Sequence, residues 1–349
     1  MEKIRVLIVD DSAVVRELLS KSLTADPRFE VVGTAVDPYS ARDKIALRNV
    51  DVLTLDIEMP RMDGLTFLKY LMKYFPIPVV IVSSLTDGKN AASLDALELG
   101  AVDIVPKPGG AYSVADILET LKEKILTAAS LDFSKIKVQA QKNRDFVLKE
   151  PKRLLSQIVT TNKLIAVGAS TGGTIALETL FKGFTQDFPP TVCVIHMPER
   201  FTTTFAQRLD SICRVNVVEA ADGMMLVPAT VYLAPGNFHL MVRARGKDFY
   251  LRVVDGPKVH HQRPAVDVLF QSVAVEAGRN AVGILLTGMG RDGADGLLKI
   301  KNAGGTTIAQ DEASCIVFGM PKEAIALGAA GKVLPLEQIA EAVHQTVKN

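Results

Sequence analysis

Three acidic residues in the first third of the sequence each stand directly after an apolar run. Asp10 and Asp11 follow the run that ends at Val9, and Asp56 follows the run that ends at Leu55. Short runs that are apolar throughout are typical of buried parallel strands, whose carboxyl ends meet at one edge of a sheet. Three neighbouring carboxylates repel one another unless a cation lies among them, and Mg²⁺ prefers such oxygen ligands. The spacing therefore predicts a divalent-cation site at this edge.

Two serines and a lysine stand at the ends of two further apolar runs. Ser83 and Ser84 follow one run, and Lys107 follows the other. At the same sheet edge, a hydroxyl and an ammonium group could contact the oxygens of a group bound to Asp56. Aspartate is also common at strand ends because it caps the next helix. Acids, hydroxyls and an amine at successive strand ends nevertheless favour one shared site.

A second candidate site begins at a serine that stands between glycines. Ser170 belongs to the sequence Gly168-Ala-Ser-Thr-Gly-Gly173, which matches G-x-S-x-G between an apolar run and an apparent helix. Such a turn lifts the hydroxyl above the sheet, and the N–H of Thr171 can point at a developing oxyanion. A glycine-rich turn before a helix can also bind phosphate, although the dinucleotide and P-loop spacings are not met. Plain turn chemistry is the third interpretation.

A nucleophilic serine needs a base and an acid that orients the base. His196 is favoured as the base because it follows an apolar run, at the carboxyl edge where Ser170 is expected. The acid is expected in the glycine-rich loop after another run, where Asp292 is nearer to the strand end than Asp295. The N–H of Met289 in that loop could be a second oxyanion donor. The remaining histidines are His239, His260, His261 and His344.

The elements that must position these residues alternate along the chain. Apolar runs are separated by stretches with apolar residues at three- and four-residue spacing, which predicts helices between parallel strands. We expect two doubly wound, mostly parallel, three-layer α/β domains, the first flavodoxin-like and the second Rossmann-like, with a local hairpin in the second. A polar, basic stretch between them predicts a linker. The expected parts are residues 1–125, a linker at 126–157 and residues 158–349.

Composition excludes several classes of protein. With 48% hydrophobic and 23% charged residues, the 349-residue chain has the composition of a soluble globular protein. A net charge of +1 gives no reason to expect nucleic acid as a partner. Three cysteines without a C-x-x-C pair argue against a disulfide framework and a zinc site. No apolar run approaches the roughly 18 residues that span a bilayer, so we expect a cytoplasmic protein without membrane insertion.

Residues 1–125 resemble the receiver domains of two-component signalling. The matching segments are Val9-Asp-Asp11, Leu55-Asp-Ile-Glu-Met-Pro60, Met62-Asp-Gly64, Val82-Ser-Ser84 and Lys107-Pro108. The resemblance implies that Asp56 accepts a phosphoryl group from a histidine kinase in the presence of Mg²⁺.

The same resemblance assigns roles to the surrounding residues. Lys107 would contact the phosphoryl group, and Ser83, with Ser84 as the second candidate, would be the switch hydroxyl. Ile104 stands where such domains often have an aromatic residue, three positions before the lysine. The Mg²⁺ ligands would be Asp10, Asp11, Asp56 and the main-chain carbonyl of Glu58.

The rest of the chain resembles the catalytic domain of the chemotaxis protein-glutamate methylesterase (CheB) family. Beyond the serine turn, the matching blocks include His196-Met-Pro198, Ala234-Pro-Gly236, Asp255-Gly-Pro257, Leu286-Thr-Gly-Met-Gly-Arg-Asp-Gly293 and Ala309-Gln-Asp-Glu-Ala-Ser-Cys315. With the receiver, the resemblance covers essentially the whole chain. It implies a catalytic triad of Ser170, His196 and Asp292, with Thr171 and Met289 on the oxyanion side.

This resemblance also implies the activity and the partners. The substrate would be a γ-methyl ester of glutamate on the cytoplasmic helices of chemoreceptors, and deamidation of glutamine is a related activity. The esterase step would need no cofactor, and a chemotaxis histidine kinase would be the phosphodonor. We also expect a monomer in which the unphosphorylated receiver inhibits the catalytic domain. A nucleic-acid-binding output is disfavoured because the second domain shows neither a helix-turn-helix nor a basic recognition face.

Overall fold

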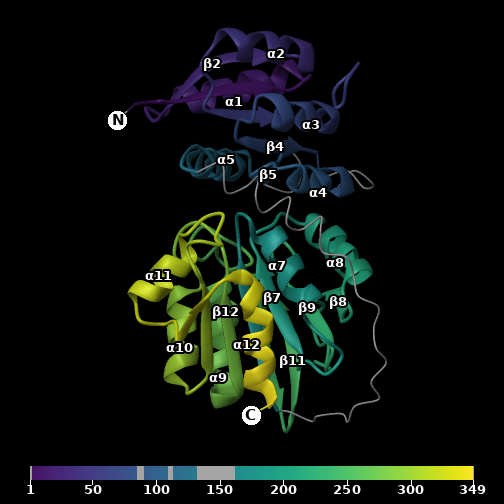
Figure 1. The fold of residues 1–349 in the computed structure, drawn as a ribbon, viewed down its shortest axis with the longest axis vertical. Helices are drawn as coiled ribbons and strands as arrows, with labels where there is room; N and C mark the ends of the chain where they lie inside the picture. The colour runs from purple at the N-terminus through teal and green to yellow at the C-terminus, as the bar shows by residue number, and fades with distance from the viewer. Residues whose placement is uncertain (1, 85–89, 109–112, 132–161, 349) are drawn as a thin grey trace. The chain divides into compact units, whose positions relative to one another are not determined.

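The computed structural model describes residues 2–84, 90–108, 113–131 and 162–348. The chain divides into two compact units, Met1–Asp145 and Phe146–Asn349, each with its own sheet (Figure 1). Most of the predicted linker, 126–157, lies outside the described residues. Within the described residues, no helix is long and apolar enough to cross a membrane.

The first unit has a five-stranded parallel sheet of order β2-β1-β3-β4-β5. Because β1 and β3 are neighbours, the residues that follow them meet at one carboxyl edge. This confirms the predicted flavodoxin-like fold. The strands are β1 (Ile4–Val9), β2 (Phe29–Ala35), β3 (Val52–Leu55), β4 (Val79–Ser83) and β5 (Asp103–Pro106).

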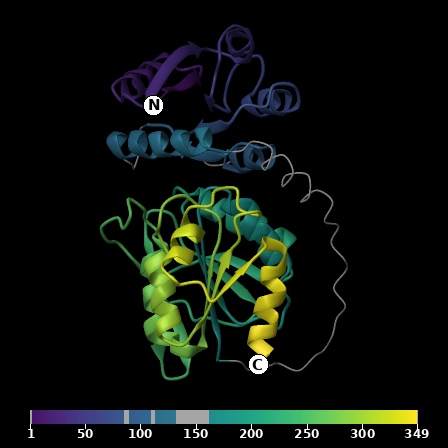
Figure 2. The same cartoon turned by 60° about the vertical axis from the view of Figure 1, so that its left-hand side comes forward.

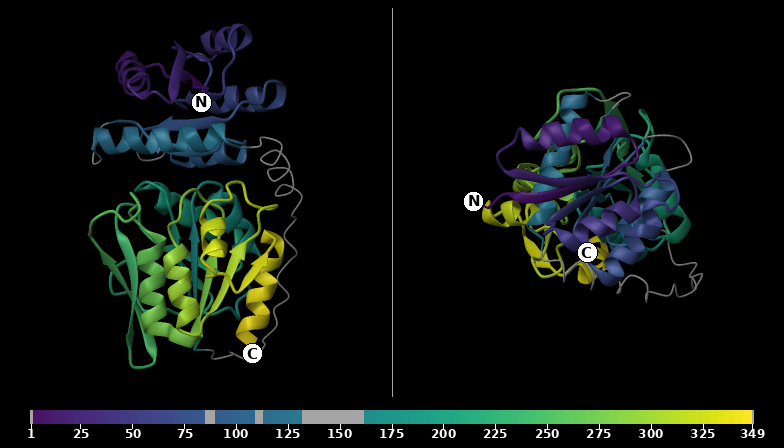
Figure 3. Two further views of the ribbon diagram at one scale, coloured as in Figure 1. Left: turned by 90° about the vertical axis from the view of Figure 1, so that its left-hand side faces the viewer. Right: turned by 90° about the horizontal axis from the view of Figure 1, so that it is seen from above.

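Helices cover both faces of this sheet. Helices α1 and α5 contact each other on one face, whereas α2, α3 and α4 lie on the other (Figure 3, right). Helix α5 continues beyond the predicted domain end at residue 125, because Ile125 and Ala128 extend its buried face. The helices are α1 (Ala13–Thr24), α2 (Pro38–Leu47), α3 (Gly64–Tyr74), α4 (Asn90–Glu98) and α5 (Val114–Ala129).

The second unit has a seven-stranded parallel sheet of order β14-β13-β12-β6-β7-β9-β8, which confirms the predicted α/β class. The sequence had not indicated the edge strands β8 and β14. Both are short and partly exposed, so neither forms a continuous apolar run. The strands are β6 (Leu164–Ala169), β7 (Thr191–Ile195), β8 (Asn216–Glu219), β9 (Thr230–Leu233), β12 (Ala281–Leu285), β13 (Thr306–Gln310) and β14 (Lys332–Leu334).

Helices again lie on both sides of the larger sheet. Figures 2 and 3 show α9 and α10 on one side of the strands and α12 on the other. The predicted hairpin is formed by β10 (His239–Arg245) and β11 (Asp248–Val254), and β10 packs against α9. The helices are α7 (Gly173–Lys182), α8 (Phe201–Ile212), α9 (Val266–Ala277), η1 (Gly278–Asn280), α10 (Ala294–Asn302), α11 (Met320–Ala326) and α12 (Leu336–Lys348).

The first residue of α9 approaches the central strand β6 very closely. A Cβ atom on Gly168, in β6, would lie only 2.3 Å from Cγ1 of Val266. Only glycine permits this approach, because any side chain there would displace the helix. The contact brings the N-terminus of α9 to the sheet edge at which β6 ends, and so places that helix end beside the serine turn.

Candidate functional site

The three aspartates of the first unit gather at the carboxyl edge of its sheet. Asp10 and Asp56 are buried and Asp11 is exposed, and one carboxylate oxygen from each lies within 4.8 Å of the others. Lys107 Nζ lies 2.8 Å from Asp56 Oδ2 and 3.0 Å from Asp10 Oδ2. The backbone N–H of Glu58 donates a hydrogen bond to Asp56 Oδ1. The structure therefore assembles the predicted acids and the lysine in one cluster.

The negative charge of this cluster exceeds the positive charge of Lys107. Three carboxylates face one ammonium group, and that group is shared between Asp56 Oδ2 and Asp10 Oδ2. Burial raises the pKa of Asp56 to about 6 and also raises the pKa of Asp10. The pKa of Lys107 is raised although burial opposes this, because its contacts with the two aspartates outweigh burial. This donor set fits a hard divalent cation such as Mg²⁺.

The two serines after β4 have different partners. The hydroxyl of Ser93, in α4, donates to Ser83 Oγ at 3.0 Å, whereas the hydroxyl of Ser84 donates to Glu58 Oε1 at 3.2 Å. Ile104 is buried in β5, at the position where receiver domains often have an aromatic residue. The switch roles of the two serines stay predictions.

In the second unit, the register of two neighbouring strands places the serine and the histidine side by side. Ala169, the last residue of β6, is paired with Ile195, the last residue of β7. Ser170 and His196 follow directly, and the N–H of His196 donates to the carbonyl of Ala169. Ser170 is buried, and its own N–H donates to the carbonyl of Thr287. The two side chains thus leave the sheet at the same level.

The acid next to the histidine is Asp292. His196 Nε2 lies 2.7 Å from Asp292 Oδ2, and both side chains are almost completely buried. The same carboxylate accepts the backbone N–H groups of Val266 and Asp267, at the N-terminus of α9. Burial opposes ionisation, but these hydrogen bonds, foremost that from His196, hold the pKa of Asp292 below its usual value. Since Nε2 binds the carboxylate, Nδ1 is the ring nitrogen that can serve Ser170.

Other candidates from the sequence have structural roles. The side chain of Asp295 is 45% exposed and pairs with Arg291, four residues earlier, so Asp292 is the one that contacts His196. His239 accepts the N–H of Ala265 at Nδ1, which leaves its Nε2 proton for the carbonyl of Pro257. The ring of His344 stacks on Phe188.

The expected oxyanion donors flank the serine. Thr171 is buried and precedes Gly172, whose φ of 78° turns the chain into α7. Met289 is 42% exposed and follows Gly288, where an added Cβ would lie 2.7 Å from the Cβ of Ser170. Both backbone segments therefore pass close to the serine. The donor roles of their N–H groups stay predictions.

The sequence analysis missed a buried polar network behind the serine. The Thr287 hydroxyl donates to the carbonyl of Thr171 at 3.0 Å and accepts the N–H of Val317 at 2.9 Å. The Thr287 N–H donates to Oε1 of the fully buried Gln310. The sequence offered one signal for this network, namely that polar residues stand at or just after the ends of β12 and β13. This network fixes the backbone that carries Thr171, and Thr287 is therefore a positioning residue.

A second histidine–aspartate pair lies next to Asp292 and was also missed. His260 Nε2 lies 2.9 Å from Asp267 Oδ2, and Asp267 Oδ1 accepts the N–H of Gly296. Burial raises the pKa of Asp267. One ligand atom each of His260, Asp267 and Asp292 lies within 4.8 Å of the others. Backbone N–H groups at the N-terminus of α9 already donate hydrogen bonds to Asp292. The positive end of the helix dipole therefore disfavours a metal cation at this cluster.

Comparisons with known proteins cover both units. The family model described as CheB methylesterase matches residues 165–343, and that of the response regulator receiver domain matches residues 6–122. Protein-glutamate methylesterase/protein-glutamine glutaminase 2 of Syntrophus aciditrophicus (strain SB) is 50% identical over 349 residues, covering 99% of this chain and 100% of the relative. A relative from Sulfurimonas denitrificans with the same name, without the numeral, is 51% identical and covers 96% of both chains.

A solved structure extends the likeness to three dimensions. The crystal structure of the Thermotoga maritima CheB methylesterase catalytic domain is 41% identical in sequence and superimposes with a TM-score of 0.52. The match covers 53% of this chain and 98% of that chain.

Replacing Thr287 by Val should weaken the site and the fold together. The variant leaves the Val317 N–H and the Thr171 carbonyl without their hydroxyl partner, at a cost of about 1–3 kcal/mol in the free energy of unfolding. We expect Ser170 to react more slowly with a fluorophosphonate probe, because Thr171 is displaced. Thr287→Ser keeps the hydroxyl and is the matched control. Equal labelling rates and equal stability in the two variants would contradict the positioning role.

Proposed function

The chain belongs to the CheB methylesterase family, and from this premise we propose that it hydrolyses γ-methyl esters of glutamate on the cytoplasmic helices of chemoreceptors. The observation that carries the proposal is the 2.7 Å contact between His196 and Asp292, beside a serine that the strand register places next to His196. The relatives that match over almost the full length are named protein-glutamate methylesterase/protein-glutamine glutaminase.

The mechanism follows from the order of these side chains. Ser170 Oγ attacks the ester carbonyl while His196 Nδ1 takes the serine proton. The N–H groups of Thr171 and Met289 bind the oxyanion of the tetrahedral intermediate. His196 then returns the proton to the departing methoxide, which leaves as methanol. Asp292 holds the imidazole in the required tautomer and stabilises the imidazolium that forms in between.

Water completes the cycle. His196 takes a proton from a water molecule that attacks the acyl-enzyme, and returns it to Ser170 Oγ as the glutamate carboxylate leaves. A glutamine side chain would react in the same way, with ammonia as the leaving group in place of methanol. The second activity in the relatives' names therefore needs no further residue in this site.

Replacing Ser170 by Ala should abolish methanol release from methylated receptor membranes, because no other group replaces the nucleophile. Asp292→Asn should lower kcat by about 10⁴-fold, since an amide cannot hold the imidazole tautomer or stabilise the imidazolium. Asp295→Asn changes a half-exposed carboxylate three residues away and should leave kcat nearly unchanged. Turnover that persists in Ser170→Ala, or equal losses in the two aspartate variants, would refute the triad.

We propose that Asp56 of the first unit accepts a phosphoryl group from a histidine kinase. Asp10, Asp11, Asp56 and the main-chain carbonyl of Glu58 would hold Mg²⁺, which neutralises charge on the phosphoryl oxygens when bound. Lys107, already within 2.8 Å of Asp56, would contact a phosphoryl oxygen. Ser83, or Ser84, would donate its hydroxyl to another.

Mg²⁺ should stabilise the receiver in a pH-dependent way. At about ten times its dissociation constant it should add about 1.4 kcal/mol to the receiver's free energy of unfolding. Without Mg²⁺, burial of ionised Asp56 disfavours the folded state, so this group's contribution to stability is greatest below pH 3.8 and is lost as the pH rises through about 6. The cation binds the carboxylate form, so its stabilising effect should decrease as the pH falls through about 6.

Calorimetry of the full chain at pH 7 and pH 5, with and without MgCl₂, measures this effect. Asp10→Asn removes one proposed ligand and should remove most of the stabilisation at pH 7. A Mg²⁺ effect of the same size at both pH values, or one that survives in Asp10→Asn, would contradict the site.

We further propose that the unphosphorylated receiver inhibits the esterase and that phosphorylation of Asp56 relieves this inhibition. A small phosphodonor with Mg²⁺ should raise the rate of methanol release by about tenfold, a coupling of ordinary size for two linked sites. In Asp56→Asn the phosphodonor with Mg²⁺ should leave the rate of methanol release unchanged. Removal of residues 1–150 should raise the basal rate. A phosphodonor response retained in Asp56→Asn, or a folded fragment no faster than the full chain, would overturn this regulation.

A further inference from the structure

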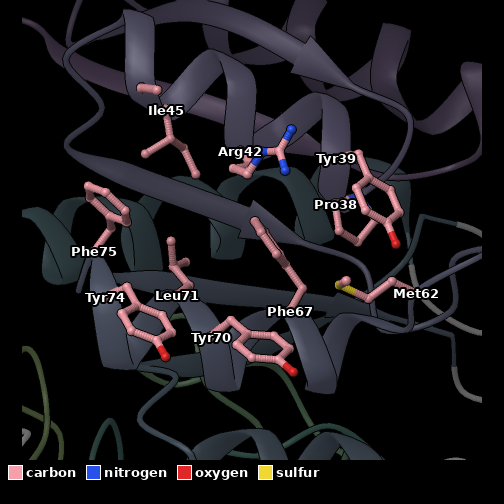
Figure 4. Close-up of a pocket in the computed structure, with 11 residues that line it drawn as sticks. Pro38, Tyr39, Arg42, Ile45, Met62, Phe67, Tyr70, Leu71, Tyr74 and Phe75 are labelled. Atoms are coloured by element: carbon pink, nitrogen blue, oxygen red, sulfur yellow. The ribbon is translucent and has the colours of Figure 1, made fainter.

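The receiver has an apolar groove between α2 and α3 that none of the proposed steps uses. Its volume is about 250 Å³. Figure 4 shows the rings of Phe67, Tyr70 and Tyr74 along α3, with Phe75 at its end and Ile45 on the facing helix α2. At one end the groove reaches Met62, in the segment that follows Asp56.

The aromatic side chains of this groove are more exposed than packing of the receiver requires. Phe75 is 63% exposed, Tyr74 59% and Tyr70 52%, and the rings of Tyr70 and Tyr74 stack at 6.5 Å. Phe67 and Leu71 of the same helix are buried, although they also line the groove. Several large apolar side chains exposed in one groove indicate a surface that another molecule covers.

The charges around the groove have one dominant sign. Helices α2 and α3 together carry four cationic residues, Arg42, Lys44, Lys69 and Lys73, and one acidic residue, Asp43, whose carboxylate accepts hydrogen bonds from Arg42. Asp37 and Asp63 cap the N-termini of the two helices. Lys73 Nζ lies 4.9 Å from the centre of the Tyr74 ring, so cationic and aromatic groups are adjacent on this surface. A partner that covers the groove therefore needs an apolar face bordered by carboxylates.

We propose that this groove binds an acidic amphipathic helix of a partner protein. A helix laid between two helices contributes apolar side chains at three- and four-residue spacing, which suits an elongated groove lined by aromatic rings. Carboxylates along the edges of that helix would meet Arg42 on α2 and Lys73 on α3. The inference does not rest on the proposed esterase or on phosphorylation of Asp56.

Two occupants from this chain itself fit the charges less well. A second copy docked by the same surface would place the cations of its α2 and α3 against identical cations, because a two-fold interface is self-complementary. The segment at residues 146–159, which overlaps the end of the predicted linker, carries three basic residues and one acid, and so has the same sign as the groove. Charge complementarity therefore favours a separate, acidic partner.

Tryptophan fluorescence can test the proposal on the full chain, because the protein has no tryptophan of its own. The probe is a synthetic helical peptide of about 18 residues, about five turns, with one Trp and several Leu on one face and Glu on the other. A matched peptide carries Lys in place of each Glu. We expect saturable binding of the Glu peptide with a blue-shifted emission, weakened by added salt, and much weaker binding of the Lys peptide.

Variants assign the binding to the groove. Phe75→Asp should weaken binding of the Glu peptide by about tenfold or more, whereas Val275→Asp, at a residue 72% exposed on α9 of the other unit, should not. Arg42→Glu combined with Lys73→Glu should reverse the preference in favour of the Lys peptide. All of these residues are exposed, and thermal unfolding checks that each variant is folded.

Several results would overturn the proposal. These are no binding of the Glu peptide, equal binding of the two peptides, or equal effects of Phe75→Asp and Val275→Asp. Self-association of the protein that Phe75→Asp abolishes would assign the groove to a second copy instead. None of these results bears on methanol release, so failure here leaves the proposed esterase standing.

Discussion

The carboxylate of Asp292 joins three parts of the catalytic unit. It follows β12, binds His196 after β7, and accepts two backbone N–H groups at the start of α9. Ala265 at the helix N-cap has no side chain that could satisfy those groups, so the carboxylate acts as the cap from a distant part of the chain. One buried charge thus stabilises a helix end and fixes the orientation of an imidazole.

Each unit has its site at the carboxyl edge of its own sheet, but the buried carboxylates of the two sites differ in how they are neutralised. Asp292 has three hydrogen-bond donors around it, and its pKa falls although it is buried. Asp56 and Asp10 share one lysine, and burial raises the pKa of both. Hydrogen bonds thus satisfy the carboxylate of Asp292, which stays ionised. The cluster of Asp10 and Asp56 is under-neutralised, and such a cluster responds strongly to an added cation or to a covalent change at Asp56.

The sequence was informative where a residue's neighbours along the chain decide its position. Continuous apolar runs located the central strands, and residues placed after them, such as Asp56 and His196, reached the expected edges. Spacing favoured Asp292 over Asp295 but could not decide between them, because the choice depends on which carboxylate reaches His196 and the start of α9. Thr287 and Gln310 were missed since their partners are distant in sequence.

The paired ends of β6 and β7 have a consequence for how this fold can vary. Side chains alternate between the two faces of a strand, so one residue added to or removed from β7 would turn the residue after Ile195 away from Ser170. The lengths of these two strands are therefore fixed by chemistry as well as by packing. Loops at the amino edge of the sheet carry no such constraint. Insertions and deletions in related sequences should therefore accumulate in those loops and be absent from β6 and β7.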